Sequence, residues 1–551
     1  MKTPHLDHPI PSNLRVAMLV TKVPSEPLTL LKQTLSGMLE QTYPHDTWVA
    51  DEDPTPESLK WYQENGVRVS CRKDETDYHN DFWPRRMKCK EGNLAYFYDK
   101  FGYENYDVVV QLDADHQPTP GYLEHMLRPF SDPKVAYVAA PSIGDRNKNF
   151  WATRARAQAG AVFHGPIQSG ANDGWIPTCI GSHYALRTKA LKEVGGIGPE
   201  LAEDYSTTLA LNSGGWSGVW SYNAEAHGDG PHTYADLITQ DYQWARSLIT
   251  LFLSYYPKHM SKLSFKHKLH FAFTQLWYPL GAMVWLVSVS LPIVALVTGI
   301  PPVSVKFSEF VMFAGAPLAL SFLIFEYARN KKHLRPKDVK FFSWENALFE
   351  LGRWPWILIA CIDGVISTAF GRKHTFRVTP KNNRTEMIPA RVLMPYFLLV
   401  IVNLLAIFFR QDGGALKGYF WFSFVIAMAY LALLISVVTL HLHEAQNKSQ
   451  KFVLRHAPQF ISSVFLGILL LVATPSQLNS ITDARNPQTI KPPIDSTPTS
   501  NSKSYTIQYG DTLWSVSKTF YGDGSKWSQI HVLDDANRIH PGTVVEIPPK
   551  P

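Results

Sequence analysis

The chain has 551 residues and a formal net charge of +6 at pH 7. That length is too great for one ordinary domain, and so weak a positive charge argues against nucleic acid as a partner. The four cysteines are far apart and form no C-x-x-C pair, which argues against a disulfide framework or a structural zinc site and suits a reducing compartment.

Residues 1–13 are polar and lack the basic-then-apolar pattern of a signal peptide, so we expect the following domain to stay in the cytoplasm. Residues 14–262 alternate short β-branched runs with helical spacing, which is typical of an α/β domain built from βαβ units on a parallel sheet. The expected elements, in order, are strand Arg15–Thr21, helix Leu28–Gln41, strand Trp48–Ala50, helix Glu57–Asn65, strand Val67–Val69 and helix Gly92–Lys100.

The stretch Asp107–Pro118 predicts a buried strand that ends in acids. Three valines and a leucine are followed by Asp113, Asp115 and His116. Ligands of open α/β sheets bind beyond the carboxyl ends of the strands, and paired carboxylates suit Mg²⁺ or Mn²⁺. The alternative is a solvated Asp-x-Asp turn.

Ordered motifs over residues 14–390 resemble the family 2 glycosyltransferases of the cellulose synthase type, which have the GT-A fold. The motifs that carry the resemblance are Thr21, Glu26-Pro27, Asp51-Glu52, Lys90-Glu91-Gly92-Asn93, Asp113-Ala114-Asp115-His116, Cys179-Ile180-Gly181-Ser182, Ala202-Glu203-Asp204 and Gln240-Asp241-Tyr242-Gln243-Trp244. The resemblance implies a Rossmann-like catalytic domain that takes a UDP-sugar donor.

The same resemblance implies a role for each matched residue. Asp204 corresponds to the catalytic base, with Glu203 beside it, in a short loop before the apolar helix Thr207–Leu211. The alternative for this acidic pair is a helix N-cap or first-turn charge. The implied metal ligands are Asp113, Asp115 and His116. The implied nucleotide-sugar contacts are Thr21, Glu26, Asp51, Glu52 and Lys90. The implied acceptor contacts are Gly181, Ser182, Gln240, Gln243 and Trp244.

Two of these positions have their own chemistry. A positive side chain such as Lys90 can offset charge on a leaving diphosphate, although a solvated lysine is the alternative. The flat ring of Trp244 suits the apolar face of a sugar, although it could be an interface aromatic. Gln243 stands where the family usually has arginine, and Arg246, about one turn further on, is a candidate replacement at the diphosphate.

Apolar runs predict five membrane spans, two within residues 263–343 and three within 391–475. The runs are Phe271–Ile300, Phe310–Ala328, Val392–Phe409, Tyr419–Leu440 and Phe460–Ala473. Within residues 344–390, the charged and apolar stretch Trp344–Phe370 predicts a helix along the membrane surface, with a sixth span as the alternative.

After that helix, a segment resembles the gating loop that closes over the donor in this family. Its matching residues are Phe376, Val378, Thr379 and Lys381. Basic residues concentrate after the second span, before the third and between the fourth and fifth. The positive-inside rule therefore puts the catalytic domain inside and the C-terminus outside.

Residues 476–503 are rich in Pro, Ser, Thr and Asn and predict a flexible tether. Residues 504–551, which open with Tyr505-Thr506-Ile507-Gln508-Tyr509-Gly510-Asp511, resemble a LysM module. The resemblance implies a small α+β fold of βααβ order that binds N-acetylglucosamine glycans such as peptidoglycan. A module without a ligand is the alternative.

Together these features favour a multi-pass membrane enzyme that polymerises a β-linked polysaccharide from a UDP-sugar, most simply UDP-glucose, and exports it. One alternative is a transferase that adds a single sugar to a lipid carrier. Another is a wall-anchoring LysM protein with a degenerate transferase domain.

Overall fold

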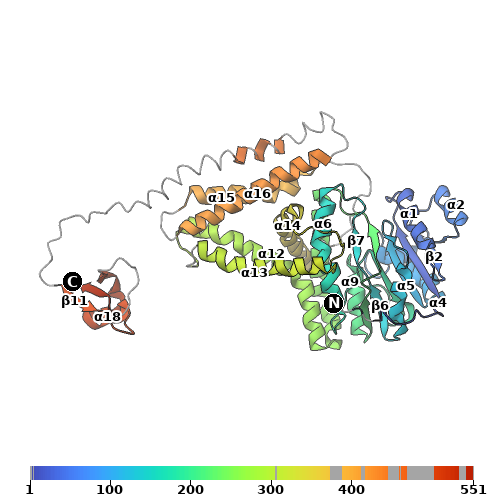
Figure 1. Ribbon diagram of the computed structural model, residues 1–551, viewed down its shortest axis with the longest axis horizontal. Helices are drawn as coiled ribbons and strands as arrows, with labels where there is room; N and C mark the ends of the chain where they lie inside the picture. Colours follow the sequence, from blue (N-terminus) through green and yellow to red (C-terminus); the bar gives the residue numbers. More distant parts are fainter. Residues whose placement is uncertain are drawn as a thin grey trace. The chain divides into compact units, whose positions relative to one another are not determined.

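The computed structural model describes residues 3–549 except 4, 304–306, 373–387, 411–415, 445–457, 460, 464, 468–501 and 533–541. The chain divides into two units, Met1–Ala473 and Thr474–Pro551. The first unit joins an α/β domain to a group of long helices (Figure 1).

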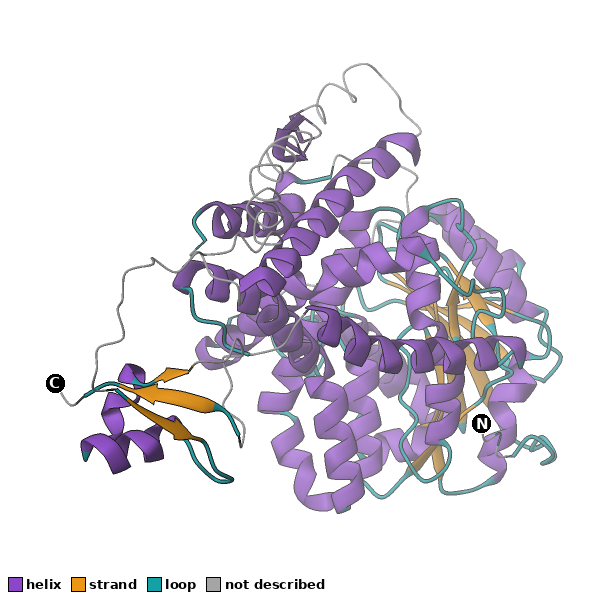
Figure 2. Cartoon of the chain, turned by 60° about the vertical axis from the view of Figure 1, so that its left-hand side comes forward, coloured by secondary structure: helices purple, strands orange, loops and turns teal. Residues whose placement is uncertain are grey.

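The α/β domain is built on a seven-stranded sheet of order β3-β2-β1-β4-β8-β6-β9, flanked by helices (Figure 2). Its strands are β1 Val16–Lys22, β2 Asp46–Asp51, β3 Arg68–Ser70, β4 Val108–Asp113, β6 Val135–Ala139, β8 His183–Arg187 and β9 Ser217–Trp220. The predicted strand ending in acids is therefore confirmed as β4, at the centre of the sheet.

Alternation along the strands explains the layers. In β1, Met18 and Val20 pack with Leu31 and Leu35 of α1 (Leu28–Leu39). The intervening residue Leu19 points to the opposite core, with α3 (Lys90–Phe97). Because neighbouring side chains of a strand point to opposite faces, a strand apolar throughout must be covered on both.

The prediction of a parallel sheet is wrong for one strand. β1 is parallel to β2 and β4, and β2 is parallel to β3, but β8 is antiparallel to both β4 and β6. The chain approaches β8 from the edge where β4 ends, since the Asp113 amide donates to the Ser182 carbonyl at 2.8 Å. A strand that starts at that edge must run the other way, and this brings the segment before β8 next to Asp113.

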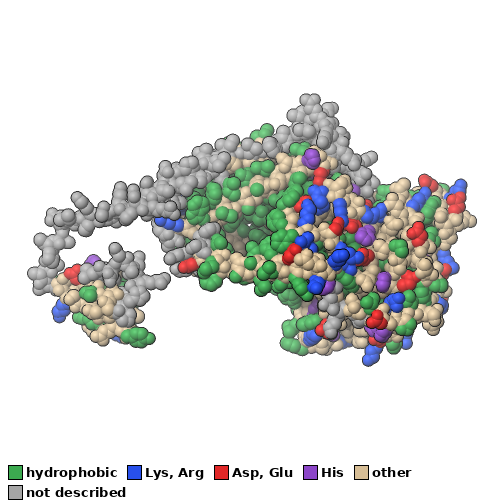
Figure 3. Space-filling view, in the orientation of Figure 1, with side chains coloured by type: hydrophobic (Ala, Val, Ile, Leu, Met, Phe, Trp, Pro, Cys, Tyr) green, Lys and Arg blue, Asp and Glu red, His purple; other side chains and the backbone are tan. Residues whose placement is uncertain are grey.

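Long helices follow or insert into the α/β domain. They are α6 Trp151–Val162, α10 Tyr234–Ser254, α12 Phe265–Thr298, α13 Phe307–Asn330, α14 Trp344–Phe370, α15 Ala390–Phe408 and α16 Lys417–Glu444. Five of them, α12 to α16, are long and apolar enough to cross a membrane. Hydrophobic side chains gather over this part of the molecule, whereas charged side chains gather over the α/β domain (Figure 3).

Four of the five predicted spans correspond to α12, α13, α15 and α16. The fifth, Phe460–Ala473, lies largely outside the described residues, as does the predicted gating loop. The fifth helix that meets the length and hydropathy criteria is instead α14, which we expected along the membrane surface.

α14 packs lengthwise on α10 of the α/β domain, and glycines allow the close approach. A Cβ at Gly352 would lie 1.9 Å from the Tyr234 hydroxyl, and one at Gly364 would lie 2.3 Å from Ile249 Cγ2. α14 also contacts α6, α12 and α16. Its position along the membrane surface stays a prediction, with a sixth span as the alternative.

Contacts also tell which helix ends lie at the α/β domain. After α13, the Lys332 carbonyl accepts from the Tyr222 hydroxyl at 2.8 Å. At the end of α16, Glu444 accepts from the Trp151 amide at 2.7 Å. Between α12 and α13, by contrast, the Val303 amide donates to Tyr419 near the start of α16 at 3.0 Å. The end of α13 and the end of α16 therefore both lie at the α/β domain, while their starts lie away from it.

The second unit contains β11 Lys503–Thr506, α18 Leu513–Tyr521, the 3₁₀ helix η7 Gly524–Gln529, β12 His531–Val532 and β13 Val544–Ile547. The strands form an antiparallel sheet of order β11-β13-β12. The predicted βααβ order differs in two respects within the described residues. A 3₁₀ helix stands where the second α-helix was expected, and a short third strand pairs with β13.

Candidate active site

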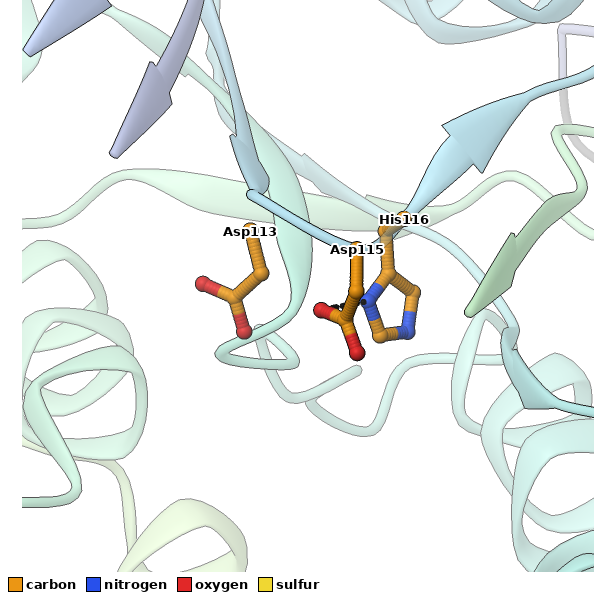
Figure 4. A group of neighbouring side chains, drawn as sticks. All are labelled: Asp113, Asp115 and His116. Carbon is orange, nitrogen blue, oxygen red and sulfur yellow. Dashed lines mark hydrogen bonds and ion pairs between the residues drawn. The ribbon is translucent and has the colours of Figure 1, made fainter. Parts of the chain in front are cut away.

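The acidic residues after β4 form a compact group (Figure 4). One ligand atom from each of Asp113, Asp115 and His116 lies within 4.8 Å of the others. The turn is held by β10 (Ala226–Gly228), which pairs with β5 (Gln117–Pro118) and with β7 (Ser142–Gly144). The fold thus presents two carboxylates side by side at the carboxyl edge of the sheet.

These residues fit a divalent cation. Asp113 and Asp115 supply the carboxylate oxygens that Mg²⁺ and Mn²⁺ prefer. Both ring nitrogens of His116 have protein partners, since Nδ1 lies 3.1 Å from Asp115 and Nε2 lies 3.1 Å from the Ser142 hydroxyl. His116 can therefore also orient Asp115, and its role as a metal ligand stays a prediction.

Lys90, at the start of α3, lies at the centre of the site. Its Nζ donates to Asp113 Oδ1 at 2.5 Å and to the Gly181 carbonyl, and it lies 3.9 Å from Glu203 Oε1. Burial opposes the charged form, but the carboxylates of Asp113 and Glu203 outweigh it and raise the pKa of Lys90. The ammonium is thus protonated and sits between the acids.

Glu203 and Asp204 form the first turn of α9 (Glu203–Ser213), so the prediction that they precede the helix in a loop is wrong. The Thr208 hydroxyl donates to the Asp204 carbonyl at 2.8 Å, and the preceding Ala202 carbonyl accepts from the Ser206 amide at 3.0 Å. Helical bonding therefore starts earlier than the apolar pattern suggested. Acids in a first turn also interact favourably with the helix dipole.

Burial raises the pKa of both carboxyl groups above the ordinary range. The Glu203 side chain is buried, and its Oε1 accepts no hydrogen bond from the described residues. Asp204 Oδ1 accepts from the Tyr205 amide at 2.7 Å. A Cβ at Gly181 would lie 3.2 Å from Asp204 Oδ2, so the segment before β8 lies directly against this carboxylate.

The predicted nucleotide residues line the same edge. Thr21 is aligned with Asp113 on β4, and Asp51 ends the neighbouring strand β2. Asp51 is fully buried, where it pairs with Lys22 at 2.9 Å and accepts from the Tyr62 hydroxyl at 2.9 Å. Sequence reasoning did not find this pairing, and the proposed uracil contact of Asp51 stays a prediction.

The other two candidate nucleotide contacts, Glu26 and Glu52, stabilise loops at this edge of the sheet. Glu26 accepts from the Val23 amide at 3.0 Å, and Glu52 pairs with Arg72. Arg72 also donates to the Tyr78 and Arg86 carbonyls at 2.8 Å each, and thereby organises the loop before Lys90. Arg72 was missed because an arginine in a charged loop gives no local signal.

The acceptor candidates Gln240, Gln243 and Trp244 lie on α10. Trp244 is 43% exposed, and the Arg156 guanidinium lies 4.8 Å from the centre of its ring. Arg246 is buried and pairs with Asp363 of α14 at 2.9 Å. This pairing holds Arg246 at α14, so its predicted diphosphate contact gains no support.

The structure thus brings Lys90, Asp113, Gly181, Glu203 and Asp204 together from four parts of the chain. Residues 108–325 match the model of glycosyl transferase family group 2. This region of the chain is therefore similar to family 2 glycosyltransferases, and it includes the three metal candidates, the acidic pair on α9 and Trp244.

Its curated relatives include cellulose synthases. The chain is 28% identical over 275 residues to the cellulose synthase 1 catalytic subunit (UDP-forming) of Komagataeibacter xylinus, which covers 48% of this chain and 35% of that protein. It is 24% identical over 419 residues to the cellulose synthase catalytic subunit (UDP-forming) of Komagataeibacter sucrofermentans, over 72% of this chain and 52% of that protein. The chain thus spans about a third to a half of these relatives.

Among solved structures, a mannosyltransferase from Pyrobaculum calidifontis in complex with GDP-mannose and Mn²⁺ is similar to this chain with a TM-score of 0.42 and 14% identity, over 66% of this chain and 90% of that one.

Proposed function

We propose that this chain is a membrane-embedded, inverting, processive glycosyltransferase that extends a β-linked polysaccharide from a UDP-sugar, with UDP-glucose as the donor. The observation that carries the proposal is the position of Lys90 between Asp113 and the acidic pair on α9. A cation-binding acid, a protonated lysine and a candidate base within one cluster suit transfer from a nucleotide diphosphate sugar.

On the donor side, Asp113 and Asp115 would hold Mg²⁺ or Mn²⁺, which would offset negative charge on the donor diphosphate. Lys90 would add its ammonium to the same charge. Thr21, Glu26, Asp51 and Glu52 would surround the nucleotide.

On the acceptor side, Asp204 is the proposed general base. It takes the proton of the acceptor hydroxyl, whose oxygen then bonds to the anomeric carbon while the bond from that carbon to the diphosphate oxygen breaks. One base and no nucleophilic carboxylate are needed for inversion. Glu203 lies beside Lys90, and burial, which disfavours the charged form, raises the pKa of the proposed base Asp204.

Trp244, Gln240 and Gln243 would hold the end of the growing chain on α10, with Gly181 and Ser182 near the base. α10 packs against both α14 and α12, so the acceptor end lies next to the apolar helices. This arrangement supports export of the product through the membrane part of the same protein. Residues Phe376–Lys381 would close over the donor.

The position of each helix end gives a proposed sidedness. The helix ends at the α/β domain belong to the cytoplasm, which supplies UDP-sugars. The four spans α12, α13, α15 and α16 return the chain to that side at Glu444, because this residue contacts α6. A fifth span at Phe460–Ala473 would put the C-terminal unit outside, where a LysM module would bind cell-wall glycan such as peptidoglycan and tether the exit side.

UDP release in membranes, measured with and without polymer formation, separates the alternatives. UDP release together with polymer supports the proposal. UDP release with only single sugars on lipid would indicate the lipid-carrier transferase, and no UDP release from any donor would indicate a degenerate domain that serves wall anchoring. The intact cluster around Lys90 favours the first outcome.

A further inference from the structure

We propose that Arg156 is a positioning residue for the acceptor platform, and that it fixes the indole of Trp244 so that one face of the ring is left for sugar. The inference rests on the proposed function, because it assumes that Trp244 meets the growing glycan. No motif singled out Arg156, which lies on α6, 88 residues before Trp244 in the sequence.

Arg156 lies against aromatic rings from two other helices. Its guanidinium carbon lies 4.8 Å from the centre of the Trp244 ring on α10 and 4.8 Å from that of Phe349 on α14. Guanidinium groups stack on aromatic faces through cation–π attraction. A side chain that contacts two rings loses freedom to move, and it limits rotation of the more exposed ring, Trp244.

Hydrogen bonds also hold the same guanidinium. Nη2 donates to Asp241 Oδ1 at 2.8 Å and to the Leu237 carbonyl at 3.1 Å, both on α10. Asp241 is fully buried, so its charge needs partners within the protein. Arg156 thus binds α10 one turn before Trp244 and stacks on the ring itself.

Arg353 of α14 completes the arrangement. Its Nε lies 2.6 Å from Asp241 Oδ2, and it also pairs with Glu350 at 2.9 Å. Its guanidinium carbon lies 4.9 Å from the centre of the Phe349 ring and 5.6 Å from that of Tyr278 on α12. The carboxylates of Asp241 and Glu350 balance the charges of the two arginines. The two arginines are therefore better suited to position the Trp244 ring than to bind an anion.

A sugar that stacks on Trp244 needs a ring of fixed plane with one open face. The guanidinium of Arg156 covers part of the indole, while 43% of the residue remains exposed. The acceptor would therefore approach from the face opposite Arg156. The contacts through Arg353 and Tyr278 also tie this platform to the first membrane helix, α12.

The test compares two lysine substitutions on the same helix. Arg156→Lys keeps the charge but loses the flat stacking surface and the forked hydrogen bonding. Arg154→Lys is the matched control, since Arg154 is also on α6 but pairs with Glu345 of α14 at 3.0 Å. Purified protein is given labelled UDP-glucose with Mn²⁺, and polymer formation and UDP release by transfer to water are measured separately.

We expect Arg156→Lys to lower polymer formation on the order of 100-fold, the loss that a misplaced positioning contact can cause. UDP release to water and the KM for donor should stay within about twofold, because the donor site is not touched. The control should keep both activities. Normal polymer formation by Arg156→Lys, or an equal loss of both activities, would overturn the proposal.

A double-substitution cycle keeps the proposal testable if Arg156→Lys also lowers stability. If Arg156 acts through Trp244, the substitution should have little further effect on polymer formation in a Trp244→Ala background. Additive losses would contradict the positioning role. Wild-type protein that forms no polymer would count against the proposed function, which is a separate outcome from any result on Arg156.

Discussion

The Asp204→Asn substitution tests the proposed base most sharply, because it removes a proton acceptor and keeps the shape of the side chain. Asp204 lies in the first turn of α9, close to Gly181, and is not a candidate donor or metal contact. We expect donor binding to be nearly unchanged and turnover to fall about 10²- to 10⁴-fold, the usual contribution of a general base. That fall corresponds to roughly 3–5 kcal/mol of activation free energy.

Whereas Asp204→Asn should lower turnover, it should raise the stability of the folded protein at about pH 8. Burial raises the pKa of Asp204 in the folded chain, so the folded state binds a proton more readily than the unfolded state. The stabilisation that follows is fully present below the unfolded pKa and is lost as pH rises through the folded pKa. At about pH 8 the ionised carboxylate therefore costs the folded protein about 1.4 kcal/mol for each unit of the shift, and asparagine removes that cost.

The assay combines steady-state polymer synthesis, Mn²⁺-dependent UDP binding and thermal unfolding at about pH 8 and about pH 4. The asparagine variant should unfold at a higher temperature than wild type at the higher pH, and this advantage should disappear at the lower pH. In wild type, activity should fall on acidification at a higher pH than an ordinary aspartate would give. Glu203→Gln is the matched control for loss of a neighbouring buried carboxylate.

Near-normal polymer synthesis by Asp204→Asn would show that another group takes the proton. A lowered unfolding temperature together with lost donor binding would show that the substitution acts on structure, and the base assignment would lose its support.

Three further predictions follow from the same account. Asp113→Ala and Asp115→Ala should each weaken Mn²⁺-dependent UDP binding, measured by calorimetry, because each removes a carboxylate ligand; unchanged binding in both would remove the metal assignment. Deletion of Phe376–Lys381 should abolish synthesis while the unfolding temperature of the α/β domain is retained; a normal rate of polymerisation would make the segment a connector only. In a cysteine-free background, Ser500→Cys should react with an impermeant maleimide on intact cells, and reaction only after lysis would put the tail inside.

Local pattern was enough to predict much of the fold. The valines of β4 and the acids after it predicted both the central strand and the acidic cluster at its end, because strand burial and strand-end chemistry depend on neighbouring residues. The apolar runs likewise predicted α12, α13, α15 and α16, since a membrane span needs only length and hydropathy.

Contacts between distant segments could not be predicted in this way. The antiparallel direction of β8 depends on which edge of the sheet the chain reaches after α6. The five-residue sequence of β8 does not indicate in which direction the strand runs. Glu203 and Asp204 belong to α9 because hydroxyl and backbone bonds extend the helix toward them. The contact of Arg156 with Trp244 joins two helices far apart in the sequence, so neither helix alone indicates it.

The most direct test of the central claim is synthesis by the purified protein. It is reconstituted in lipid vesicles with Mn²⁺ and given a panel of labelled UDP-sugars, and any product is digested with linkage-specific hydrolases. The account predicts UDP release coupled to a long, β-linked polymer from UDP-glucose, with both lost in Asp204→Asn. UDP-sugar consumption that yields no polymer from any donor, or a polymer made equally well by Asp204→Asn, would contradict it.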